Sequence, residues 1–176
     1  MSDVQGNVEI SKEARSIFLN GDFCKSHILQ IVKGLKELEA KNPHREIDIY
    51  INSPGGLVSE MICLYETIRN LSCKVNTHGM GHVYSAGAFL LTVGTGIRYG
   101  YKNSRYMLHE ISGGTFGKIT DIQIKQREMS RMQEQINKII ANHTGKEIDK
   151  VSEDMEKDFY MNAEEALEYG IIDEIF

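Results

Sequence analysis

The sequence contains no tryptophan and only 2 prolines and 3 cysteines in 176 residues. The cysteines, Cys24, Cys63 and Cys73, are odd in number and form no CxxC pair, so the sequence predicts neither a disulfide framework nor a zinc site. We expect them to be buried free thiols. The 6 histidines include no HExxH motif, which argues against a metal enzyme.

Long apolar runs and strongly basic runs are also missing. No stretch approaches the roughly 18 apolar residues that a bilayer span requires, and the N-terminal "MSDVQGNVEI" lacks the basic-then-apolar pattern of a signal peptide. The formal net charge of −5 without a basic run argues against nucleic-acid binding. These absences predict a cytoplasmic globular protein.

Strand-like and helix-like stretches alternate along most of the chain. The polar residues 1–14 are expected to form a flexible segment, and residues 15–176 a single domain. Strands are expected at 15–21, 47–52, 73–79, 105–110 and 171–175. Helices are expected at 26–41, 57–71, 85–94, about 119–142, 147–157 and 163–169. The alternation predicts an α/β fold with mainly parallel strands.

The stretch "HVYSAGAF" (82–89) places Ser85 between a predicted strand and a predicted helix. A hydroxyl at a helix N-terminus lies where free N–H groups stabilise negative charge, and the small residues after it would let a substrate carbonyl approach. The alternative is a plain N-cap serine with tight packing behind it. This stretch alone does not decide between a nucleophile and a cap.

A serine nucleophile needs a base and an orienting acid. His109 ends a predicted strand just before a glycine-rich loop, a position typical of catalytic groups, although a lone histidine is more often bonded to backbone. For the acid, Asp158 lies where a charged stretch turns aromatic, and Asp154 and Asp173 remain rivals. The turn "NSPGG" (52–56) could direct an N–H of Gly55 or Gly56 at a carbonyl.

Six blocks in order resemble the proteolytic subunit of the Clp protease family, from about residue 15 to residue 176. The blocks are "YINSPGG" (50–56), "MGHVYSAGAFLL" (80–91), "NSRYMLHE" (103–110), "GGTFGKITDIQI" (113–124), "HTGK" (143–146) and "AEEALEYGIIDEI" (163–175). The resemblance implies a serine endopeptidase with Ser85 as nucleophile, His109 as base and Asp158 as orienting acid. It also implies an oxyanion hole formed by the N–H groups of Gly56 and Ala86.

The resemblance further implies a crotonase-like spiral of βαβ units with a protruding handle at about 111–142, made of a glycine-rich strand (111–118) and a long helix. In the family, subunits form heptameric rings that stack through the handles, and an AAA+ unfoldase feeds the chamber. No cofactor is implied for this chain, with ATP entering only through that partner. Substrate backbone is expected to bind along a short set of residues: Gly55, Ser112, Gly113, Gly114, Thr115 and Phe116.

Several positions depart from the family pattern. Asp48, Asn70 and His78 replace apolar or aromatic residues of the unfoldase-docking surface, which predicts weaker binding of the usual partner. Phe159 and Gln123 replace the two members of an ion pair between rings, which leaves open whether two rings stack. The rival from another class is a non-catalytic ring subunit, and a third hypothesis is an acyl-CoA enzyme on the related crotonase fold.

Overall fold

The computed structural model of the chain describes residues 6–176. In this part of the chain the strands are β1 (Asn7–Ser11), β2 (Ser16–Asn20), β3 (Ile47–Ser53), β4 (Val75–Tyr84), β5 (Arg98–Gly100), β6 (Arg105–Leu108), β7 (Phe159–Met161) and β8 (Glu174–Ile175). The helices are α1 (Lys25–Lys41), α2 (Val58–Arg69), α3 (Ala86–Thr92), α4 (Ile119–Thr144), α5 (Ile148–Met155) and α6 (Ala163–Tyr169). No helix among them is long and apolar enough to cross a membrane.

The long strand β4 divides the sheet into two branches. The first part of β4 continues the order β1-β2-β3-β4-β5-β8, in which only the β1–β2 pair is antiparallel. The last part, from His82 to Tyr84, pairs instead with β6, which in turn pairs antiparallel with β7. Ser85, which directly follows β4, therefore lies at the end of the part that pairs with β6.

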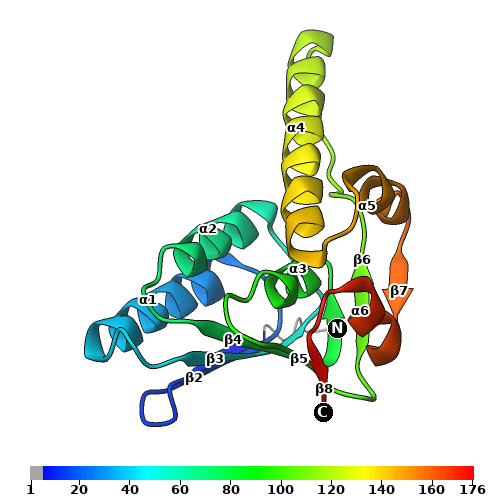
Figure 1. Ribbon diagram of the computed structural model, residues 1–176. Coiled ribbons are helices and arrows are strands. Elements are labelled where there is room, and N and C mark those ends of the chain that lie inside the picture. The colour runs from blue at the N-terminus through cyan, green and yellow to red at the C-terminus, as the bar shows by residue number, and fades with distance from the viewer. Residues whose placement is uncertain (1–5) are drawn as a thin grey trace.

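Helices α1, α2 and α3 pack against one face of the sheet, and α4 projects away from the body of the subunit (Figure 1). The core between them is built from strand residues such as Ile49 and Ile51 and from the helix residues Leu35, Leu64 and Leu91, all fully buried. Burial of such side chains contributes roughly 1.5–3 kcal/mol each. This packing of the helices on the sheet holds the connection between β4 and α3 in place.

The structure confirms the α/β class with mainly parallel strands, and corrects three expectations. Residues 7–11 are not loose: they pair with β2 as an edge strand because Val8 is buried in the core, whereas residues 1–5 lie outside the described part. Residues 111–118 form no strand, because none pairs with them in the chain as described. Free thiols are confirmed, but only Cys73 is buried, and Cys63 is exposed.

A pH dependence of stability is expected from His143, in the last turn of α4. Burial, followed by the charges of Arg98 and Arg69, lowers the pKa of its imidazole. Below about pH 6.5 the unfolded chain takes up a proton there that the folded chain accepts only at lower pH, so stability falls as the pH falls. Urea unfolding at pH 7.5 and pH 5.5 should show a smaller loss for His143→Gln than for the wild type, and equal losses would contradict this expectation.

Candidate active site

Ser85 occupies a strained turn between β4 and α3. Its backbone has φ 54° and ψ −120°, and only one other non-glycine residue in the described chain has a positive φ. Such a conformation costs about 1–3 kcal/mol and persists where the surroundings enforce it. Here the Ser85 N–H donates to the Met107 carbonyl at 2.8 Å, and the Ser85 carbonyl accepts from the Phe89 N–H at 2.9 Å. Turns of this kind present a serine hydroxyl at the end of a strand.

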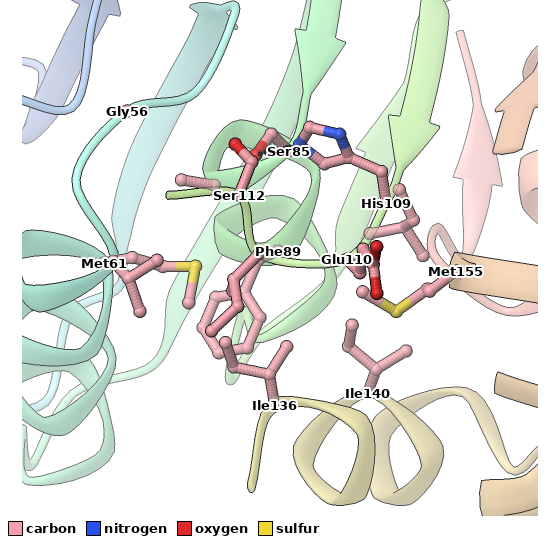
Figure 2. Close-up of a pocket in the computed structure, with 14 residues that line it drawn as sticks. Gly56, Met61, Ser85, Phe89, His109, Glu110, Ser112, Ile136, Ile140 and Met155 are labelled. Atoms are coloured by element: carbon pink, nitrogen blue, oxygen red, sulfur yellow. Dashed lines mark hydrogen bonds between the residues drawn. The ribbon is translucent and has the colours of Figure 1, made fainter. Parts of the chain in front are cut away.

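The hydroxyl of Ser85 faces a histidine and does not cap the helix. Ser85 stands at the N-cap position of α3, but its side chain makes no capping hydrogen bond. Its Oγ lies 2.9 Å from Nε2 of His109, which follows β6 (Figure 2). Because β6 pairs with the end of β4, the sheet itself sets this distance. The plain N-cap alternative is therefore not supported by the structure.

Asp158 lies on the other side of the imidazole. Its Oδ1 is 3.3 Å from Nδ1 of His109, and the carboxyl side chain is half exposed. Asp158 directly precedes β7, and the β6–β7 pairing brings it to His109. The Tyr160 hydroxyl is 3.4 Å from Asp158 Oδ2, and partial desolvation and the Asp158 charge raise the pKa of this phenol, so it remains a donor.

The two rival carboxylates are engaged elsewhere. Asp154 pairs with Lys150 and accepts a hydrogen bond from Tyr169 at 3.0 Å. Asp173 accepts a hydrogen bond from the Arg98 side chain at 2.9 Å. Burial alone would raise the pKa of Asp173, but the hydrogen bonds from Arg98 and the Arg98 charge outweigh it, so the pKa is lowered. Of the three candidates, only Asp158 contacts His109.

The glycine turn after β3 passes directly against Ser85. A Cβ added to Gly55 would lie 2.6 Å from Ser85 Cβ, and φ at Gly55 is 105°. Gly56 pairs with Phe23 through a bridge and has φ 150°. The N–H groups of Gly56 and Ala86 donate no hydrogen bond to any residue within 6–176. Both remain available to an oxygen that approaches Ser85.

A cavity of about 70 Å³ opens beside the Ser85–His109 pair (Figure 2). Its walls are mostly apolar and come from α2, α3, α4 and the end of α5: Met61, Phe89, Ile136, Ile140 and Met155. The cavity can hold an apolar side chain next to a bond that Ser85 attacks. In the sequence these residues lie within stretches that predict helices, and helix periodicity does not separate pocket walls from core.

The predicted substrate-binding segment, residues 112–116, runs away from the site with its backbone N–H groups unpaired in the described chain. Ser112 lines the cavity, whereas the residues from Gly113 to Phe116 do not. None of the N–H groups of residues 112–116 donates to another residue within 6–176, and Thr115 Oγ1 is buried without a partner there. Unpaired backbone groups in series are typical of an edge that another strand joins.

The three substituted positions separate into two places, and one of them, His78, is buried at 6% exposure. Asp48 Oδ1 lies 2.9 Å from His78 Nε2, so these two polar side chains contact each other across β3 and β4. The His78 ring stacks between Tyr50 and Tyr99, with ring centroids at 4.3 and 4.7 Å. Asn70 lies apart at the end of α2, where its amide donates to the Glu66 carbonyl. Sequence reasoning missed this row of stacked rings, which only the strand register reveals.

No metal site is formed by the described residues. Within residues 6–176, no group of three or more His, Cys, Asp or Glu side chains is arranged to hold a metal ion. The polar side chains that line the cavity are those of Ser85, His109, Glu110 and Ser112, and the Ser85 hydroxyl contacts the His109 imidazole. This set fits acyl transfer through a serine nucleophile.

Comparison with known proteins gives a matching family model and curated relatives. A family model described as Clp protease matches residues 4–176. The chain is also 38% identical over 164 residues to the ATP-dependent Clp protease proteolytic subunit 1 of Rhodopirellula baltica, an alignment that covers 93% of this chain and 72% of that protein. Both matches confirm the resemblance predicted from the sequence motifs and support the crotonase-like fold that it implied.

Proposed function

Because this chain belongs to the Clp protease family, we propose that it is a serine endopeptidase that cleaves unfolded polypeptides. The observation that carries the proposal is the 2.9 Å contact between Ser85 Oγ and His109 Nε2 at a strained strand-to-helix turn. Nucleophile and base within hydrogen-bond distance, with a carboxylate behind the base, is the arrangement that activates a serine hydroxyl.

In the proposed reaction, Ser85 Oγ attacks the carbonyl carbon of the scissile amide while His109 Nε2 accepts the hydroxyl proton. His109 then gives this proton to the leaving amine, which leaves an ester on Ser85. Water attacks the ester with His109 again as base, and releases the new carboxyl end. Asp158 holds the imidazole with Nδ1–H toward its carboxylate, at the 3.3 Å separation seen here.

The oxyanion of the tetrahedral intermediate would accept hydrogen bonds from the N–H groups of Gly56 and Ala86. Their lack of partners in the described chain and the closeness of the glycine turn to Ser85 support this role. The substrate backbone would add as a strand along residues 112–116, where five successive N–H groups are unpaired in the described chain. Gly55 lies beside Ser85, but its N–H donates to Ser53 Oγ at 3.1 Å, so it would shape the site and not bind substrate backbone. The apolar cavity would take one substrate side chain.

We further propose that the subunit works in the cytoplasm as part of a heptameric ring. An AAA+ unfoldase would deliver substrate to this ring, and ATP would act only through that partner. Phe116, Ile119 and Ile124 at the start of the handle are 94%, 75% and 57% exposed, which supports a surface covered on assembly. Native mass spectrometry would give the ring size and show whether two rings stack. We retain the prediction of weak binding to a standard Clp unfoldase, because Asp48, Asn70 and His78 stand where the family has apolar or aromatic docking residues.

A fluorophosphonate probe tests the catalytic proposal against the non-catalytic alternative. The purified full-length chain should gain one covalent adduct, which peptide mapping places on Ser85, and a His109→Ala variant should label at least about a hundredfold more slowly because the base is lost. A wild-type protein that stays unlabelled while intact and folded would favour the non-catalytic ring subunit.

A further inference from the structure

The chain that leaves His109 is held from two sides by two successive N–H groups. The Glu110 N–H donates to the Met155 carbonyl at the end of α5, at 2.7 Å. The next N–H, of Ile111, donates to the side-chain oxygen of Gln133 on α4, also at 2.7 Å. Because the two acceptors belong to different helices, these bonds fix the segment between α5 and α4.

The amide of Gln133 is itself held in one orientation. Its Nε2 donates to Asn137 Oδ1 at 2.7 Å, one helical turn further along α4. Asn137 is buried, at 6% exposure, and it packs within the part of α4 that contacts the core. With the nitrogen committed to Asn137, the oxygen of Gln133 must face Ile111. Asn137 and Gln133 thus connect the buried half of the handle helix to the backbone next to His109 through two hydrogen bonds in series.

We propose that Gln133 is a positioning residue for the catalytic histidine and for the start of the peptide-binding edge. This inference rests on the proposed function. Gln133 binds the backbone of Ile111, which is only two residues after His109. The bond therefore sets where the backbone turns from the imidazole toward the handle. By occupying the Ile111 N–H it also makes Ser112 the first residue whose N–H is unpaired. A substrate strand would therefore pair from Ser112 outward and not closer to the imidazole.

The loss of this acceptor should slow the chemistry more than it weakens substrate binding. In Gln133→Met the side-chain volume is kept, but the Ile111 N–H loses its partner in a partly buried place and the segment shifts. A misplacement of about 1 Å can cost on the order of a hundredfold in rate. We expect kcat for a fluorogenic peptide to fall about tenfold or more, with KM changed by less than about threefold.

The labelling rate of Ser85 by the fluorophosphonate separates positioning from mere stability. The small probe needs Ser85 and His109 but not residues 112–116, so its rate per folded molecule should fall by about the same factor as kcat. Gln133→Glu should stay within about threefold of the wild type: its carboxylate accepts from Ile111, and the Asn137 amide, turned over, donates to its second oxygen. Gln135→Met, on the exposed side of the same helix, is the matched control and should change neither rate.

Asn137→Leu keeps the inference testable if Gln133→Met does not fold. This variant frees the Gln133 amide to rotate, and we expect an intermediate loss of labelling rate. Unchanged kcat and labelling in the folded Gln133→Met variant, or in Asn137→Leu where the first does not fold, would overturn the positioning role while the proposed function stands. A wild-type chain that does not label at Ser85 would overturn both.

Discussion

Replacement of Ser85 by alanine should reduce peptide hydrolysis by at least about a thousandfold, because no other hydroxyl in the described chain contacts the His109 imidazole. The loss should appear in kcat/KM for a fluorogenic peptide and in the cleavage of an unfolded protein. The fold should be little affected, since the Ser85 hydroxyl makes no capping bond and the backbone bonds to Met107 and Phe89 remain. We expect thermal unfolding within a few degrees of the wild type.

The matched control for this variant is Ser59→Ala, an exposed serine in the first turn of α2 whose hydroxyl contacts only Glu60. It should retain hydrolysis within about twofold, since surface substitutions of this kind change little. Substantial peptidase activity in purified Ser85→Ala, insensitive to fluorophosphonate, would place the nucleophile elsewhere and remove the basis of the proposed mechanism.

The sequence predicted the strongly periodic helices closely and missed two strands of three residues. The helix expected at 26–41 is α1 (Lys25–Lys41), and the one expected at 163–169 has the predicted bounds. Periodicity determines such elements because one face of each packs on the core. β5 and β7 have three residues each, too few to show an alternation, and exist because β4 and β6 offer partners. Tertiary pairing, which no local pattern records, creates them.

The residue types of the candidate site could be predicted from the sequence, but its geometry could not. Motif resemblance pointed to Ser85, His109 and Asp158, and the structure brings these three together. The positive φ of Ser85 follows from neighbouring strands and not from the serine itself, since serine has no intrinsic preference for that conformation. The bond between Gln133 and Ile111 joins α4 to a segment 22 residues away, and a glutamine on a mostly polar helix gives no local sign of it.

Replacement of Gly55 by alanine should lower kcat/KM by about a hundredfold and also destabilise the fold. The new Cβ would stand 2.6 Å from Ser85 Cβ, a separation that non-bonded carbon atoms do not reach, and 3.1 Å from the Ala86 nitrogen, which is also tight. Neither neighbour is a flexible side-chain end, so the turn and Ser85 must move apart. That movement would shift both the nucleophile and the N–H groups proposed for the oxyanion, where small displacements are costly.

The matched control is Gly145→Ala at the C-terminal end of α4, because it separates backbone strain from collision. Gly145 also has a positive φ, 72°, but a Cβ added there meets nothing within 4 Å. Both variants therefore force a side chain into a left-handed conformation, at a cost of about 1–2 kcal/mol, and only Gly55→Ala pushes on Ser85. Kinetics per folded molecule should be normal for Gly145→Ala and strongly reduced for Gly55→Ala. Equal activity in both variants would mean that the glycine turn tolerates displacement, and that its closeness to Ser85 does not matter for the reaction.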